Sequence, residues 1–407
     1  MKPTINMLFV AFLFCSMNFM HRTDPADPVK VDERNKSGYI FNVNVSKINS
    51  KYSEIPSTVF KNKLVIVSSK KIGAIGKKVD PLTNEPYTDL FCTDIQPNTD
   101  FSYPLLFSRI LNTKSSEGQV AFSPDEHTVY YTRSEIDNSA NYKLYKATLQ
   151  ENSSGNWVNH VELSISSNTY SIENPHVSAD GKFLYFSSNK TGGFGGFDLY
   201  KSEIKTDASI GKPINLGSFV NSTEDEKYPY TSIDGKELYF SSTGFNSIGG
   251  YDIYISDIIE ENYSKPRNLG YAINSKKDEV GFMIIANNTG VFSSNKNPTS
   301  DGFDIYRFEA EAIYRLLQGV VVTEDNRILP NSTVVLLNAE GQELERQITG
   351  IDASYRFKVK AFGDYQLVAI KEGFEDLSIH FESEEAQSTA VLRLSPNVIY
   401  NRSKPKP

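Results

Sequence analysis

The sequence predicts an all-β fold: a five-bladed β-propeller followed by a small β-sandwich. Three observations lead to this prediction. A unit of about 54 residues recurs along the chain. Each unit contains strand-like runs separated by turn residues. The recurrence then stops, and roughly 80 residues of a different rhythm follow it.

Each unit opens with Asn, then Ser or Thr, three free positions and Glu. The copies are Asn49/Glu54, Asn112/Glu117, Asn168/Glu173, Asn221/Glu226 and Asn274/Glu279. A strand rich in hydroxyl residues follows, as in Tyr239-Phe-Ser-Ser242, and then a third strand such as Tyr251-Asp-Ile-Tyr254. A period of this length is typical of a four-stranded propeller blade.

Turns and closure complete the predicted propeller, which spans residues 38–310. Asp180-Gly181 and Asp234-Gly235 stand between strand-like runs, where hairpins need such residues. The apolar stretch Tyr39–Val45 precedes the first unit without a partner, so we expect it to complete the last blade and remove exposed sheet edges. A six-bladed count would require a blade that the sequence does not contain.

The periodicity ends after Phe308, and residues 316–396 are predicted to form the β-sandwich. Short β-branched runs such as Thr333-Val-Val-Leu-Leu337 alternate there with turn residues. The polar, proline-broken tail 397–407 is predicted to be disordered.

At the other end, residues 1–20 are interpreted as a signal peptide and residues 21–37 as a linker. The apolar run Met7–Phe14 has the length of a signal-peptide core and is too short to cross a bilayer. We therefore expect an exported protein with no transmembrane segment in the mature chain. Lipidation at Cys15 is an alternative that Phe14 disfavours, and otherwise Cys15 belongs to the apolar core of the signal peptide.

Charge and motifs limit the classes of function. The net charge of -8 has no basic stripe, which argues against nucleic acid as a partner. The five histidines show no metal-ligand spacing, and the chain contains no Gly-x-Ser-x-Gly or His-Glu-x-x-His run. The sequence thus predicts no cofactor, no metal and no enzyme activity.

The recurring glutamates are the first candidate site. Glu54, Glu117, Glu173, Glu226 and Glu279 could ring one mouth of the propeller channel and attract a cation or a basic peptide. The alternative is that each carboxylate accepts backbone N–H bonds and fixes a turn between blades, since a constant spacing to Asn is what a turn requires.

Loop aromatics are the second candidate site. Phe194, Phe245 and Tyr251 could form a contact surface on one propeller face, or they could pack over neighbouring blades. A calcium role is considered for the Asp residues that begin the third strand of most units. We favour instead a residue that bonds local backbone amides, because each unit offers one carboxylate and Lys143 replaces it in one copy.

Two segments resemble known families. Ser178–Lys190 and Gly192–Tyr200 resemble the WD-like repeats of TolB-type propellers, and residues 316–396 resemble the carboxypeptidase regulatory-like domain, a transthyretin-like sandwich. The combination is similar to the middle part of PorE-type periplasmic proteins of the type IX secretion and gliding machinery in Bacteroidetes. The tetratricopeptide array and OmpA-like module of those proteins are not recognisable in this sequence.

This resemblance implies a function as a non-enzymatic protein-binding scaffold in the periplasm or at the periplasmic face of the outer membrane. Its expected partners are other envelope proteins, including outer-membrane secretion or gliding components. Two alternatives stay open: a carbohydrate- or peptide-binding surface protein, and a divergent propeller lyase or hydrolase.

Overall fold

The computed structural model describes residues 32–397, apart from 71–78, 82–83, 97–99, 136–137, 301 and 384–386. The predicted signal peptide, Cys15, most of the predicted linker and the tail from residue 398 lie outside the described residues. Every regular element in the described part is a β-strand, which confirms the all-β prediction. None of the described segments forms a helix long and apolar enough to cross a membrane.

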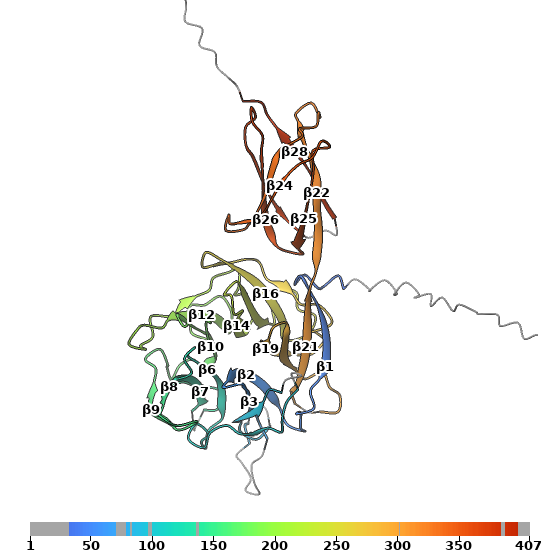
Figure 1. Ribbon diagram of the computed structural model, residues 1–407. Helices are drawn as coiled ribbons and strands as arrows, with labels where there is room; N and C mark the ends of the chain where they lie inside the picture. Colours follow the sequence, from blue (N-terminus) through green and yellow to red (C-terminus); the bar gives the residue numbers. More distant parts are fainter. Residues whose placement is uncertain are drawn as a thin grey trace, which may run out of the picture. The chain divides into compact units, whose positions relative to one another are not determined.

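Strands β1 to β21 form five antiparallel sheets that surround a common centre, as in a propeller (Figure 1). The first sheet contains β2 (Glu54–Phe60), β3 (Lys63–Ser68), β4 (Asp89–Asp94) and β5 (Leu105–Leu106). The second contains β6 (Glu117–Phe122), β7 (Thr128–Ser134), β8 (Tyr142–Leu149) and β9 (Trp157–Glu162). The third contains β10 (Ile172–Val177), β11 (Phe183–Ser188), β12 (Asp198–Glu203) and β13 (Ile214–Asn215).

The last two of these sheets depart slightly from the simple four-strand order. The fourth contains β14 (Glu226–Thr231), β15 (Glu237–Ser242), β16 (Asp252–Ile259), β17 (Asn262–Tyr263) and β18 (Arg267–Asn268), and both short strands pair with β16. The fifth contains β19 (Glu279–Ala286), β20 (Thr289–Ser294), β21 (Asp304–Ala312) and β1 (Tyr39–Val45). The antiparallel ladder between β1 and β21 runs from Tyr39 opposite Ala312 to Val45 opposite Tyr306.

Apolar clusters join the sheets around the whole ring. The first and second sheets share Phe60, Phe122 and the fully buried Trp157. Comparable clusters join the second to the third sheet, the third to the fourth and the fourth to the fifth. Leu64 of the first sheet and Val291 of the fifth belong to one further cluster. The sheets therefore close on themselves, and burial of aromatic and aliphatic side chains holds each neighbouring pair together.

Two hairpin turns show why the local sequence folds in this way. Gly181 and Gly235 adopt φ angles of 73° and 70°, a backbone conformation in which a Cβ atom is strained. In each turn the preceding aspartate, Asp180 or Asp234, accepts a hydrogen bond from a serine hydroxyl within the same turn. The Asp-Gly pair thus fixes the connection between the first two strands of the third and fourth sheets.

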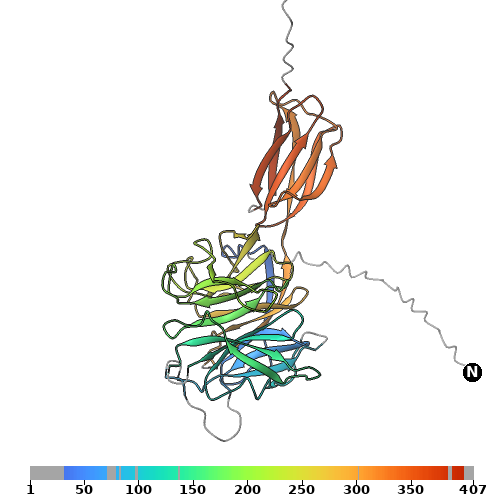
Figure 2. The same ribbon diagram turned by 90° about the vertical axis from the view of Figure 1, so that its left-hand side faces the viewer.

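The remaining strands form a C-terminal domain of two sheets. One sheet has the order β25 (Ser354–Lys360), β22 (Tyr314–Thr323), β28 (Gln387–Leu394). The other has the order β24 (Glu343–Ile348), β23 (Thr333–Asn338), β26 (Asp364–Ile370), β27 (Leu377–Glu382). Figure 2 shows these strands, coloured orange to red, lying roughly along one common axis. Both sheets contribute to a single core that includes Leu317, Phe357 and Leu367.

Two strands of this domain are not among the short β-branched runs, and its first strand begins at Tyr314. Strand β24 is polar and largely exposed, so it carries no hydrophobic signal. Strand β27 alternates Leu377, Ile379 and Phe381, a period-two signal that could have been found. Only Ile313 separates β21 from β22, because β21 continues beyond Phe308 to pair with the whole of β1.

Ring closure predicts a strong effect of Phe41→Ala. Phe41 is buried and meets Phe282 and Phe308 edge-on, with ring centroids 6.4 and 5.7 Å away. Loss of this side chain should lower the free energy of unfolding by about 3–5 kcal/mol, measured by urea denaturation. Ile40→Ala, on the exposed face of the same strand, is the control and should change stability little. Equal, small effects of both variants would contradict closure through β1.

Candidate functional site

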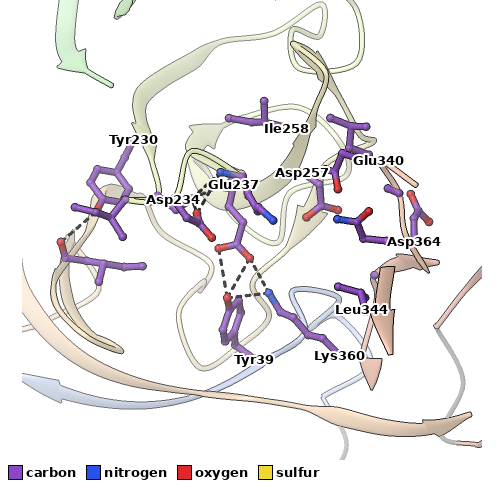
Figure 3. A pocket seen from close by; sticks show the side chains of 18 of the residues that line it. Tyr39, Tyr230, Asp234, Glu237, Asp257, Ile258, Glu340, Leu344, Lys360 and Asp364 are labelled. Carbon is purple, nitrogen blue, oxygen red and sulfur yellow. Dashed lines mark hydrogen bonds and ion pairs between the residues drawn. The ribbon is translucent and has the colours of Figure 1, made fainter. Parts of the chain in front are cut away.

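A large hollow lies between the propeller and the C-terminal domain, and we call it the junction groove. Its volume is about 640 Å³. The propeller contributes the ends of β14, β16 and β19 and the β14–β15 turn, and the C-terminal domain contributes the β23–β24 turn and parts of β25 and β26. Figure 3 shows the labelled side chains from both domains around this space.

One part of the groove lining is aliphatic. Ile258 and Ile259 end β16, Ile284 and Ile285 lie in β19, and Leu344 reaches in from β24. Ile233, on the β14–β15 turn, is 89% exposed. Clustered aliphatic side chains left in contact with water mark a surface that can gain free energy by binding a partner.

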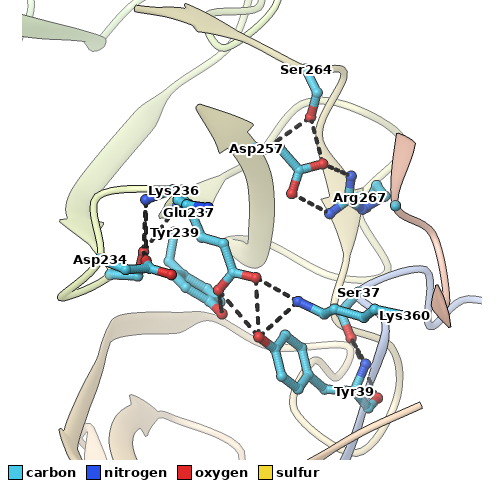
Figure 4. Close-up of polar contacts among 12 residues, drawn as sticks. Ser37, Tyr39, Asp234, Lys236, Glu237, Tyr239, Asp257, Ser264, Arg267 and Lys360 are labelled. Atoms are coloured by element: carbon cyan, nitrogen blue, oxygen red, sulfur yellow. Dashed lines mark hydrogen bonds and ion pairs between the residues drawn. The ribbon is translucent and has the colours of Figure 1, made fainter. Parts of the chain in front are cut away.

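A polar cluster joins three strands at the floor of the groove (Figure 4). Lys360 Nζ of β25 lies 2.6 Å from Glu237 Oε1 of β15 and 2.8 Å from Tyr39 Oη of β1. The Tyr239 hydroxyl donates to Glu237 Oε2 at 2.7 Å. Burial alone would lower the pKa of Lys360, but Glu237 and Tyr39 outweigh it and hold this pKa above its usual range. Lys360 is therefore charged at neutral pH.

The groove as a whole is acidic. Its lining contains the carboxylates Asp234, Glu237, Asp257, Glu340 and Asp364, against the two ammonium groups of Lys236 and Lys360. Arg267 pairs with Asp257 through both guanidinium Nη atoms. Burial and the nearby Asp257 charge raise the pKa of Asp364. The arrangement favours a ligand that brings positive charge and apolar side chains together.

No local motif could have identified the groove. Tyr39, Glu237 and Lys360 are separated by more than a hundred residues along the chain, and the sequence repeats do not include Lys360. Ile313, between the domains, donates its N–H to Gly38 and accepts a hydrogen bond from the Ala361 N–H. The three segments meet because β1 closes the propeller beside the passage into the C-terminal domain.

Four of the five candidate glutamates are buried at the first residue of an innermost strand. Glu54, Glu117, Glu226 and Glu279 are at most 2% exposed. Each accepts hydrogen bonds from the backbone N–H and the hydroxyl of the Ser or Thr four residues earlier, as Glu226 does from Ser222 at 2.8 and 2.6 Å. This geometry is that of a carboxylate that fixes the turn before an innermost strand. Glu117 also pairs with Arg133 at 2.9 Å and borders a pocket on the propeller axis.

Glu173 lies in a different environment because the third copy is one residue longer. In the other copies the Asn side chain accepts from the backbone N–H in the third strand, as Asn221 does from Leu199 at 2.7 Å. Ser166 takes this role in the third copy, accepting from the Leu144 N–H at 3.0 Å. Ile172 therefore occupies the buried position and Glu173 the next one along the strand.

The strand register confirms this shift. Ile172 lies opposite Ser188 as Glu226 lies opposite Ser242, and Glu173 matches Lys227 in the neighbouring sheet. A shift of one residue moves a side chain to the other face of its strand. Glu173 consequently faces the pocket on the propeller axis, and its Oε2 lies 2.9 Å from Lys227 Nζ.

The three candidate aromatic residues differ in their contacts. Phe194 is half exposed. Phe245 packs against the rings of Phe240 and Tyr254, and the Tyr251 hydroxyl donates to Asp225 at 3.1 Å. None of these three side chains lines the junction groove.

The aspartates that begin the third strands also have local partners. Asp198 accepts hydrogen bonds from the N–H groups of Phe194 and Gly195, and Asp252 accepts from those of Ile248 and Gly249. Within the described part of the chain, no group of three or more His, Cys, Asp or Glu residues stands close enough to hold a metal ion.

Comparison with known proteins gives only distant structural similarity. No protein-family model matches the sequence, and no curated protein matches it. TolB from Agrobacterium tumefaciens is similar in structure with a TM-score of 0.34 at 15% identity, over 61% of this chain and 71% of that chain. The similarity to TolB from Acinetobacter baumannii has a TM-score of 0.31 at 17% identity, over 62% of this chain and 52%, about half, of that chain.

An enzyme is also among the similar structures. The endo-arabinase from Bacteroides thetaiotaomicron has a TM-score of 0.44 at 11% identity, over 66% of this chain and 96% of that chain. The prediction that the present protein is not an enzyme is contradicted by this finding, because enzymes share the architecture. A fold of this kind is compatible with enzyme activity and does not decide for or against it.

Titration of Glu54 should make stability depend on pH. Burial raises the pKa of Glu54 to about 7 from 4.5, although Ser50 bonds its carboxylate. The folded state therefore binds this proton more tightly than the unfolded state. The stabilisation is complete below about pH 4.5 and is lost as pH rises through about 7. In Glu54→Gln, the free energy of unfolding should lose this part of its pH dependence, which is on the order of 3 kcal/mol. Urea denaturation at a series of pH values measures it. The control Glu309→Gln changes an exposed residue and should keep the pH dependence of the wild type.

The polar cluster at the groove floor should show measurable coupling. A double-mutant cycle of Lys360→Met and Glu237→Gln is expected to give an interaction energy of about 1–3 kcal/mol, because both groups are largely buried. The exposed pair Lys182 and Asp180 is the control and should show little coupling. Additive effects at Lys360 and Glu237 in chemical denaturation would show that the contact does not hold the domains together.

Proposed function

We propose that this protein is a protein-binding scaffold of the bacterial cell envelope and that the junction groove binds an extended segment of its partner. The groove itself carries the proposal, since it combines a partly exposed aliphatic wall with an excess of carboxylates. A hollow of about 640 Å³ is large enough to receive several side chains of a bound peptide.

The chemistry of the lining defines the expected segment. Ile258, Ile284 and the exposed Ile233 favour aliphatic side chains, while Asp234 and Glu340 favour Lys or Arg beside them. Charged groups at a partly solvated rim steer association and set specificity more than they set affinity. The bound segment is thus expected to alternate basic and aliphatic residues, and its binding should weaken as salt concentration rises.

The cellular setting rests on the sequence resemblance. We take the five sheets as five blades, the C-terminal domain as a transthyretin-like sandwich, and residues 1–20 as an export signal. In this proposal the protein acts in the periplasm or at the periplasmic face of the outer membrane, with type IX secretion or gliding components as partners. Lipidation at Cys15 would tether it to the membrane.

A peptide library with matched surface variants tests the groove. Immobilised peptides that alternate Lys or Arg with Ile, Leu or Val should bind the wild-type protein, and their acidic counterparts should not. Ile233→Lys should weaken binding roughly tenfold, because it removes an apolar contact and adds a repelling charge. Ile351→Lys is the control: Ile351 is 88% exposed, close to the 89% of Ile233, but lies outside the groove.

Two results would overturn the proposal. Equal binding by both lysine variants would place the peptide elsewhere, and the absence of any selection for basic–aliphatic peptides would remove the groove as a docking site. If neither result is found, photo-crosslinkers at positions 233 and 351, used in intact envelopes with mass spectrometry, identify the partner that contacts position 233 and not position 351.

A further inference from the structure

A second pocket lies on the propeller axis, away from the junction groove. Its volume is about 350 Å³, within the range of about 300–1,000 Å³ that is usual for small-molecule sites. The starts of the innermost strands β6, β10 and β14 line it, whereas the ends of β14 and β19 line the groove. We call it the axial pocket.

Three residues form the floor of the axial pocket. Gln119, Asn174 and Tyr228 line both this pocket and a narrow void of about 20 Å³ beneath it. Asn174 and Tyr228 occupy bulges with φ angles of 53° and 56°, which turn the innermost strands out of regular pairing. The floor of the pocket is therefore formed by side chains that can make hydrogen bonds, and not by apolar side chains alone.

Gln119 leaves one buried hydrogen-bond acceptor of the floor without a protein partner among the described residues. Its side chain is 7% exposed, and its Oε1 atom has no hydrogen-bond partner among the described residues. A buried acceptor left unpaired destabilises the folded state. Either end of the terminal amide can face the pocket, because its two orientations have the same shape. A ligand with a hydroxyl group can donate to the oxygen or accept from the nitrogen.

Four carboxylates line the pocket, those of Asp80, Glu85, Glu117 and Glu173. Serine hydroxyls donate to the first two, and the other two are ion-paired. The Glu173 carboxylate accepts from Lys227 at 2.9 Å and from the Ser171 hydroxyl at 2.8 Å, and Glu117 pairs with Arg133. A cationic ligand would have to compete with Arg133 for Glu117 and with Lys227 for Glu173, and an anion would meet all four carboxylates. The pairs leave adjacent acceptors and donors, which suit a neutral ligand rich in hydroxyl groups.

Aromatic side chains complete the lining. Tyr142, Tyr228 and Phe303 border the pocket, and burial raises the pKa of both tyrosines. Both phenols therefore stay protonated and can donate a hydrogen bond. Aromatic faces give the C–H face of a pyranose or furanose ring an apolar surface, while its hydroxyl groups reach the amides.

We propose that the axial pocket binds a neutral sugar unit, either free or at the end of a glycan, with Gln119 and Tyr228 as hydrogen-bonding residues. This site is separate from the junction groove, and the proposal does not depend on a peptide binding there.

Calorimetric titration of the whole protein tests this assignment. The neutral probes are glucose, galactose, xylose, arabinose and N-acetylglucosamine; the charged probes are lysine, spermidine and inorganic phosphate. At least one neutral sugar should bind and the charged probes should not. Oligosaccharides that end in the sugar found to bind are then titrated. If they bind, the pocket accepts the end of a glycan; if only the monosaccharide binds, the pocket takes the free sugar.

Variants distinguish a ligand site from a structural feature. Gln119→Met should weaken sugar binding roughly tenfold while leaving stability unchanged or higher, because it removes an unpaired buried acceptor. Tyr228→Phe should also weaken binding. The control Gln150→Met changes an exposed residue far from the axis and should leave binding unchanged.

Three outcomes would overturn the assignment: no neutral sugar binds, the charged probes bind instead, or Gln119→Met and Tyr228→Phe bind sugar as well as the wild type does. Peptide binding by Gln119→Met serves as a second readout, which should be unchanged because the groove lies at the other ends of the innermost strands.

Discussion

The pairing of β1 with β21 is the contact on which the rest of this structure depends. It brings residues 39–45 beside residues 306–312, so the chain forms a loop of more than 250 residues before this ladder can form. The entropy cost of such a loop grows slowly with its length, and burial of Phe41 against Phe282 and Phe308 offsets it. The same pairing places Tyr39 beside Glu237 and Lys360, and so builds the floor of the junction groove.

Buried carboxylates fix the inner ends of the sheets. Burying a carboxylate away from water costs free energy unless hydrogen bonds replace its hydration. Glu226 and Glu279 accept such bonds from serine N–H and hydroxyl groups. These bonds determine where each innermost strand begins. The walls of the axial pocket are therefore held by groups that are not themselves available to a ligand, while Glu173, displaced by one residue, is turned toward it.

The two hollows differ in chemistry although β14 contributes to both. At its start, Tyr228 lies in a pocket of amides, phenols and paired charges; near its end, Tyr230 borders a groove that is aliphatic and acidic. The first arrangement suits a small polar ligand and the second an extended basic segment. A propeller that binds at both ends of its innermost strands could connect recognition of a glycan with recognition of a protein.

The sequence by itself determined the all-β class and the recurrence of strands, because alternating apolar residues, hydroxyl-rich strands and Asp-Gly turns are local signals. It did not determine where Glu173 points. Ser166 replaces Asn in a turn that is one residue longer, and only the strand register shows which residue is buried. Nor could it reveal the junction groove, whose residues come from distant segments, or the unpaired Gln119 in a glycine-containing strand. Tertiary structure decided these features, because ring closure and strand register, rather than local spacing, determine which side chains meet.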